Sequence, residues 1–187
     1  MRTLLWLVLA VLLAGCNPYV AAVSLTAQAY GIATDVRSVS TQASDTAIEA
    51  QIKAALLTSP VAGTAGIAVY CRQGEVILAG VLPRRSPAGF AAVQIARDTS
   101  GVRRVETFYV DAQPDMAGDL ALKARIKTNL IADPRLISGQ VDVGVYAGHV
   151  LLVGVVDTWQ RVEDFREDVR SVEGVLSVRS FIQVGTI

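Results

Sequence analysis

The side chains that could perform catalysis or bind a metal are few in this sequence. His149 is the only histidine, and Cys16 and Cys71 are the only cysteines. A catalytic triad needs a nucleophile, a base and an acid side by side, and a single histidine with no second base cannot supply them. One histidine and two cysteines are also too few for a typical zinc site. We therefore predict a non-enzymatic protein with no catalytic residue, no metal and no cofactor, and we expect His149 to be a solvated turn residue.

The densest group of carboxylates lies near the C-terminus, where it could suggest a cation site. The carboxylates and the arginines between them are, in chain order, Arg161, Glu163, Asp164, Arg166, Glu167, Asp168 and Arg170. This alternation is more typical of a solvated helix face with ion pairs. Over the whole chain 17 basic residues balance 17 acidic ones, so no global charge favours binding to nucleic acid.

The N-terminus has the pattern of a lipoprotein signal. Arg2 precedes an apolar stretch over residues 4–13, which is shorter than the roughly 20 residues that a membrane-spanning helix needs. The run Leu13-Ala14-Gly15-Cys16 resembles the lipobox of bacterial lipoproteins, which implies cleavage before Cys16 and lipidation of that cysteine. The next residue is Asn17 in place of the inner-membrane signal Asp, which favours the outer membrane. An ordinary secretory signal or an uncleaved short helix is the alternative.

The remainder of the chain repeats itself. At an offset of 74 and then 73 residues, the matched pairs include Asp45/Asp119, Ile52/Ile126, Pro60/Pro134, Gly74/Gly148, Gly80/Gly154, Gly101/Gly174 and Phe108/Phe181. The segments we expect are a signal peptide over 1–15, a lipidated N-terminus and tether over 16–44, a first domain over 45–111, a linker over 112–118 and a second domain over 119–187.

Each repeat has the same predicted elements. Asp45 and Asp119 are candidate N-caps of a first helix that ends before Pro60 or Pro134. Its buried stripe recurs every four residues, as Ile48, Ile52 and Leu56 and as Leu122, Ile126 and Leu130. A hairpin turning at Gly74 or Gly148 follows, with Cys71 as a small buried side chain, and then a helix over 87–99 or 160–172 and a third strand. The order αββαβ predicts an α+β fold, a mixed three-stranded sheet packed against two helices.

This order, together with the run from Gly74 to Val81, its repeat from Gly148 to Val156, and the later Gly-Val pairs, resembles the BON domain. The segment from Asp35 to Gln42 further resembles the dual BON-domain outer-membrane lipoproteins of the DolP (YraP) type, departing only at Ser40. The resemblance implies binding of anionic phospholipid through the first helix of the second domain. It also implies support of envelope integrity and contact with the outer-membrane protein assembly machinery. The family has an aromatic residue where this chain has Ala121.

The first helix of the second repeat is also the one with an unusual surface. The residues we assign to phospholipid binding are Leu120, Ala121, Lys123, Ala124, Arg125, Lys127 and Ile131. At 100° per residue, the apolar members lie opposite the buried stripe, with Lys123 and Lys127 on one flank and Arg125 on the other. Cations beside an apolar strip fit an anionic membrane surface such as phosphatidylglycerol. The same apolar residues could instead pack against the first domain.

We therefore expect a lipid-anchored protein on the periplasmic face of the outer membrane. The alternative is a periplasmic protein-interaction scaffold, for example with the assembly machinery, that touches no lipid. A periplasmic hydrolase is the least favoured class, because the chemistry-bearing residues are missing.

Overall fold

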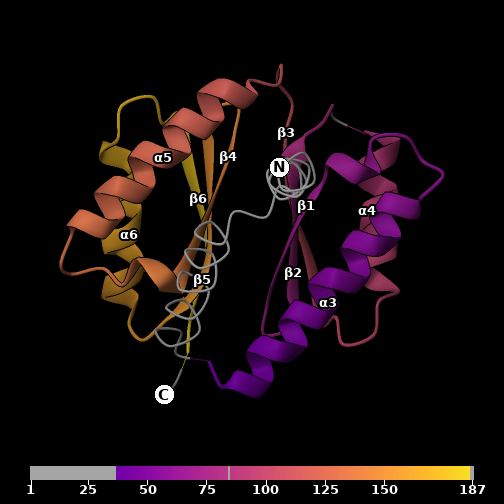
Figure 1. Ribbon diagram of the computed structural model, residues 1–187, viewed down its shortest axis with the longest axis horizontal. Helices are drawn as coiled ribbons and strands as arrows, with labels where there is room; N and C mark the ends of the chain where they lie inside the picture. The colour runs from indigo at the N-terminus through magenta and orange to yellow at the C-terminus, as the bar shows by residue number, and fades with distance from the viewer. Residues whose placement is uncertain (1–36, 84, 186–187) are drawn as a thin grey trace, which may run out of the picture. The chain divides into compact units, whose positions relative to one another are not determined.

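The computed structural model describes residues 37–83 and 85–185. The predicted signal peptide, Cys16, Asn17 and most of the predicted tether lie outside these residues. The described chain is two copies of one unit, each a three-stranded sheet with two α-helices (Figure 1). The α+β fold class and the αββαβ order predicted from the sequence are confirmed.

The helices and strands lie close to their predicted positions. In the first repeat they are α3 (Val39–Thr58), β1 (Ala68–Arg72), β2 (Glu75–Val81), α4 (Pro87–Arg97) and β3 (Arg104–Val110). In the second they are α5 (Met116–Ala132), β4 (Val141–Tyr146), β5 (His149–Val156), α6 (Trp159–Ser171) and β6 (Ser177–Val184). Single 3-10 turns, η1 (Thr64–Gly66) and η2 (Ser138–Gln140), precede β1 and β4.

Strand pairing follows from the connections. β2 is antiparallel to β1 through a tight hairpin and parallel to β3 through the α4 crossover, and β5 has the same relation to β4 and β6. Both central residues of each hairpin turn have positive φ, 53° and 75° at Gln73 and Gly74, and 50° and 77° at Ala147 and Gly148. Such turns match the twist of the strands that they join.

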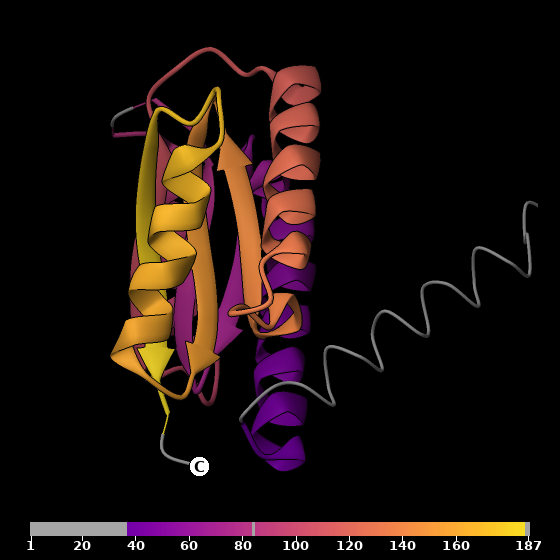
Figure 2. The same cartoon turned by 90° about the vertical axis from the view of Figure 1, so that its left-hand side faces the viewer.

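The helices cover one face of each sheet with the predicted stripes. Ile52 and Ile126 are fully buried, and Leu56 and Leu130 are each only 2% exposed. Figure 2 views the second repeat from its helical side and shows α6 in front of the sheet and α5 alongside β4. The predicted buried stripes are confirmed. They could be predicted from the sequence because a helix that covers one face of a sheet buries a side chain about every fourth residue.

The N-cap predictions are wrong. α3 begins at Val39 with Ser38 as its N-cap, and α5 begins at Met116 with Asp115 as its N-cap, whose side chain accepts from Gly118 N at 2.9 Å. The helix thus takes in residues 39–44, which the sequence analysis assigned to the tether. Asp45 lies in the second turn of α3, and its side chain is 3% exposed.

Asp45 and Asp119 instead fasten the first helix of each repeat to the hairpin. The Asp45 carboxylate accepts from Gln73 N at 2.8 Å and from Gly74 N at 2.9 Å. Asp119 accepts from Ala147 N at 2.7 Å and Gly148 N at 2.9 Å. Because these amides belong to turn residues whose donors the ladder does not use, the carboxylate fixes the turn and the helix together. Arg37 forms an ion pair with Asp45 from the segment before α3.

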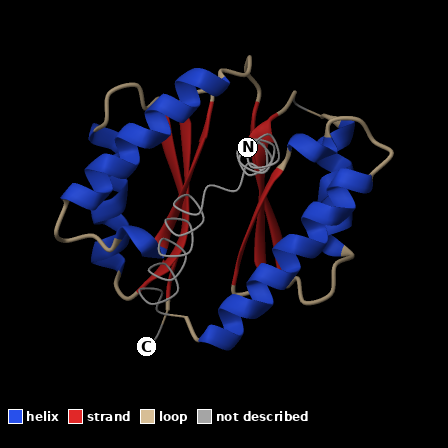
Figure 3. Ribbon diagram, in the orientation of Figure 1, coloured by secondary structure: helices blue, strands red, loops and turns tan. Residues whose placement is uncertain are grey.

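The central strands are buried on both faces, because the two sheets pack against each other (Figure 3). The buried side chains at this contact are Ile77, Ala79, Phe108, Leu151 and Val153, flanked by Tyr70, Tyr146 and Phe181. The hydroxyls of Tyr70 and Tyr146 lie 3.0 Å apart. Arg72 forms an ion pair with Asp142, and Gln183 Nε2 donates to Glu75 at 2.6 Å.

We predict that Asp45→Ala lowers the free energy of unfolding by about 2 to 4 kcal/mol, because it leaves two amide donors of the hairpin turn without their acceptor and removes the ion pair with Arg37. Urea denaturation measures the loss. Ser44→Ala is the matched control, since Ser44 is exposed on the same helix and its hydroxyl bonds only Ser40 O in the described chain. Equal effects of the two substitutions would contradict the role we give Asp45.

Candidate functional site

The outward face of α5 is a strip of exposed apolar side chains. Leu120 is 70% exposed and Ile131 is 71% exposed, on the helix side opposite Leu122, Ile126 and Leu130. Ala121 and Ala124 are exposed between them. We call Leu120, Ala121, Ala124 and Ile131 the α5 strip. A helix whose two faces are both apolar needs a second covering surface or a membrane.

The cations lie on the flanks, as predicted. Lys127 and Arg125 are exposed, and a Cβ placed on Gly174 would lie 3.4 Å from the Arg125 guanidinium, which puts that flank beside the loop before β6. Lys123 is half-buried, and burial, followed by the positive charge of Lys127, lowers its pKa. An anion bound beside Lys123 would stabilise the charged form of its ammonium group.

The structure separates the two roles that the sequence left open for the α5 strip. Packing against the first repeat would bury Leu120 and Ile131, yet both remain exposed, and the contact between the repeats is made by the sheet faces. The alternative interpretation, in which these residues pack against the first domain, is contradicted by their exposure. The sheet faces supply apolar side chains for this contact, among them Ile77, Leu151 and Val153.

The equivalent helix of the first repeat is different. Glu49, at the position of Lys123, accepts from Cys71 N at 2.8 Å and pairs with Lys53 and Arg72. Its outward positions carry Thr46 and Gln51 where α5 has Leu120 and Arg125. The net positive charge and the exposed Leu120 are therefore specific to the second repeat, whereas an exposed aliphatic side chain is shared, since Leu57 is 69% exposed at the position of Ile131.

Met116 is an exposed apolar residue of α5 that was not predicted from the sequence. It is 84% exposed as the first residue of α5, one turn before Leu120. It was missed because Asp119 was interpreted as the N-cap, which placed Met116 in the linker. The sequence signal that could have found it is Asp115, an N-cap residue followed by a full helical turn.

The candidates for catalysis have structural roles. His149 is half-buried at the start of β5, with Nδ1 2.7 Å from Ser177 Oγ. Arg166 Nη1 lies 2.6 Å from Glu163, and Arg135 lies 3.7 Å from both Asp164 and Asp168. The predicted salt-bridged helix face is thus confirmed. Among the described residues no group of three or more acidic, histidine or cysteine side chains could hold a metal.

Cys71 is fully buried in the first core. Burial raises the pKa of its thiol to about 12, helped by Asp45, to which Sγ donates at 3.4 Å. The thiolate is the reactive form, so Cys71 packs as an apolar residue, as the sequence predicted.

The described chain consists of two αββαβ units, which define a tandem-repeat α+β protein. None of the helices in this part of the chain is long and apolar enough to cross a bilayer. The BON domain family model matches residues 44–108 and 118–186, and the chain belongs to this family. Osmotically-inducible protein Y of Escherichia coli K12 is 33% identical over 142 residues, which are 73% of this chain and 70% of that protein.

Two solved structures also match. One is CdsD, a structural protein of the type III secretion system of Chlamydia trachomatis, at 14% identity and a TM-score of 0.33, covering 76% of this chain and 64% of that one. The other is the C-terminal domain of CdsD, at 14% identity and a TM-score of 0.31, covering 75% and 67%.

We predict that Cys71 resists alkylation in the native protein. The test uses a Cys16→Ser chain, in which Cys71 is the only thiol. At pH 8, iodoacetamide should react with Cys71 of the folded chain on the order of a thousandfold more slowly than with Cys71 of the urea-unfolded chain, because a pKa near 12 leaves little thiolate. Mass spectrometry measures the rate.

The same raised pKa predicts a pH dependence of stability. The folded state holds the thiol proton more tightly than the unfolded chain, whose thiol has a pKa of about 8.5, so this contribution is complete below that pH. It falls as the pH rises toward about 12. Native alkylation at the unfolded rate would contradict both expectations.

Proposed function

We propose that this protein is a non-enzymatic, lipid-anchored envelope protein whose second BON domain binds anionic phospholipid through α5. The observation that carries the proposal is the α5 strip, exposed between Lys123 and Lys127 on one flank and Arg125 on the other. The first repeat, which turns its sheet toward the second, leaves this face uncovered in the described chain.

The expected electrostatic free energy of membrane binding fits a contact that assists a lipid anchor. Each Lys or Arg near an anionic surface contributes about 1 kcal/mol, so three give on the order of 3 kcal/mol. Such a contact is weak for a free protein and becomes effective when a lipidated Cys16 already holds the domain close to the bilayer.

Aliphatic side chains take the place of the aromatic residue that the family resemblance implies at Ala121. Met116, Leu120 and Ile131 are each at least 70% exposed, and they extend over the length of α5. Because an aliphatic side chain has no polar tip for the headgroup region, the charged flanks then contribute more of the selectivity for anionic lipid.

The outer membrane, on its periplasmic face, is the location we propose. It follows from the lipobox resemblance and from Asn17, and a relative named for osmotic induction is compatible with a role in the envelope. Support of envelope integrity and contact with the outer-membrane assembly machinery are proposed on the family resemblance alone.

We predict that a fragment starting at Thr34 shows chemical-shift changes confined to residues near 116–131 when phosphatidylglycerol micelles are added. The fragment starts there because α3 begins at Val39 and Arg37 pairs with Asp45. Ile131→Gln should weaken the affinity roughly tenfold by removing apolar burial, and Lys127→Ala roughly fivefold.

The matched control is Leu57→Gln, since Leu57 is the residue of α3 equivalent to Ile131 and is 69% exposed. It should leave lipid affinity unchanged. Shifts spread over both repeats, no shifts at all, or equal losses in the two glutamine variants would favour a protein-interaction scaffold that touches no lipid.

We predict that Cys16→Ala abolishes incorporation of labelled palmitate and releases the protein from the membrane fraction. Lipidation requires the thiol of the residue that becomes the new N-terminus. Chains with Cys71→Ala should be labelled as the unmodified protein is, because Cys71 is buried. Continued labelling of the Cys16→Ala chain would refute the anchor.

A further inference from the structure

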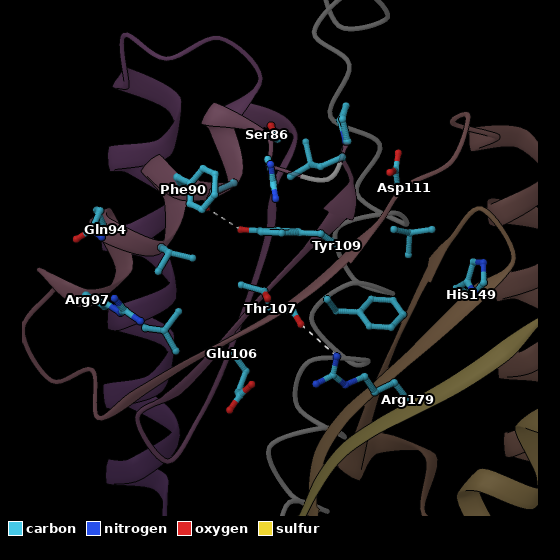
Figure 4. Close-up of a pocket in the computed structure, with 18 residues that line it drawn as sticks. Ser86, Phe90, Gln94, Arg97, Glu106, Thr107, Tyr109, Asp111, His149 and Arg179 are labelled. Atoms are coloured by element: carbon cyan, nitrogen blue, oxygen red, sulfur yellow. Dashed lines mark hydrogen bonds between the residues drawn. The ribbon is translucent and has the colours of Figure 1, made fainter.

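A groove of about 900 Å³ follows the length of β3 in the first repeat (Figure 4). One wall is α4, where Phe90, Gln94 and Arg97 face the groove. Its other wall is formed by the second repeat, through His149 and Arg179. None of the contacts assigned to the lipid surface involves these residues, so the groove is a separate feature of the molecule.

The floor of the groove is an unpaired strand edge. β3 is the outer strand of its sheet, and Val110 O accepts from Leu82 N on the side of β2. Because peptide groups alternate along a strand, those of Val105, Thr107 and Tyr109 point away from the sheet and into the groove. The described structure gives this edge one side-chain bond, from Arg179 Nη1 to Thr107 O at 3.5 Å.

The walls are apolar near the middle, and three arginines line the groove, Arg85 next to Ser86 and the pair Arg97 and Arg179. Phe90 is 63% exposed beside Tyr109, whose hydroxyl donates to Gly89 O at 3.3 Å. Arg97 on α4 and Arg179, which lies 4.8 Å from the ring centroid of Phe181, stand on either side of Thr107 (Figure 4).

Of the two carboxylates that line the groove, Glu106 is already paired with Arg104 at 2.6 Å, and Asp111 lies near the opposite end. The end at Arg97 and Arg179 therefore suits an acidic side chain.

The second repeat, which shares the fold, lacks this combination. The positions of Phe90 and Val93 are occupied there by Glu163 and Arg166, which form an ion pair at 2.6 Å. Its outer strand also has one of its outward amides satisfied internally, since Ile182 N donates to Ser180 Oγ at 3.3 Å. The apolar wall and the open strand edge therefore occur together in the first repeat and not in the second.

We propose that this groove binds an extended segment of another polypeptide, which pairs with the edge of β3 as an added strand and places an acidic side chain between Arg97 and Arg179. Main-chain hydrogen bonds to Val105, Thr107 and Tyr109 supply sequence-independent affinity, and the Phe90 wall and the arginines supply selectivity. The proposal does not rest on lipid binding by α5.

The test uses the full chain in mild detergent and a fluorescein-labelled peptide as long as the seven-residue strand β3, of alternating valine and threonine with an aspartate at each end. A peptide with lysine at each end is the control. Fluorescence anisotropy should show that the aspartate peptide binds at least tenfold more tightly than the lysine peptide, and Arg97→Glu should remove this preference.

Thr107→Pro tests the pairing itself. Proline removes an amide donor that faces the groove and spares the bonds to β2, so the sheet accepts it. It should weaken peptide affinity roughly tenfold. Ser180→Pro, at the equivalent position of β6, is the matched control and should leave affinity unchanged. Equal affinity of the Thr107→Pro variant and the unmodified protein would overturn the proposal.

Amide hydrogen exchange on the unmodified protein gives a readout that does not depend on a variant folding. Bound peptide should slow exchange at Val105, Thr107 and Tyr109 and leave the alternate residues, which already bond β2, unchanged. Failure of the aspartate peptide to bind, protection elsewhere, or protection of these three amides by phosphatidylglycerol vesicles without peptide would each overturn the proposal.

Discussion

The structure depends on burial of the central strands on both faces. Ile77 and Ala79 of β2 and Leu151 and Val153 of β5 are fully buried, yet they point away from the helices of their own repeats. A lone αββαβ unit would expose this face to water, at a cost of about 25 cal/mol for every Å² of apolar surface. Pairing the two sheets removes that cost. The helices of both repeats must then cover the opposite faces, which leaves the outward sides of the helices for recognition.

The two repeats differ in their cores, where Ala92 of the first corresponds to Phe165 of the second, and also on the surfaces that this constraint leaves free. Stripe residues, hairpin glycines and the carboxylates of Asp45 and Asp119 are shared, because each holds a helix on its sheet or a turn in place. Outward positions differ in opposite senses. The first helix carries Glu49 and Gln51 in the first repeat where the second has Lys123 and Arg125, whereas the second helix is apolar at Phe90 and charged at Glu163. Each copy therefore has one surface suited to recognition, on a different element.

Local pattern was enough to predict the elements, and it failed where a side chain's partner is distant in sequence. Ile52 and Ile126 reveal their burial through period four alone. Asp45 and Asp119 have the residue type of an N-cap, and only the position of a turn 28 or 29 residues later shows their real acceptor role. The contact between sheets was missed although the unbroken apolar runs of β2 and β5 favour burial on both faces. The α5 strip could be predicted because residues on the helix side opposite a buried stripe follow from the helical spacing alone.

The groove along β3 explains what pairing the sheets adds beyond stability. Arg179 belongs to the second repeat, yet it reaches Thr107 O of the first, so one wall of the groove exists only while the two sheets are in contact. A first repeat by itself would offer an edge strand without the second arginine. The surface proposed for lipid shares no residue with this groove, and its cations lie on α5. Contact of α5 with a membrane would therefore leave the groove open, and of the two surfaces it is the groove that depends on the contact between the sheets.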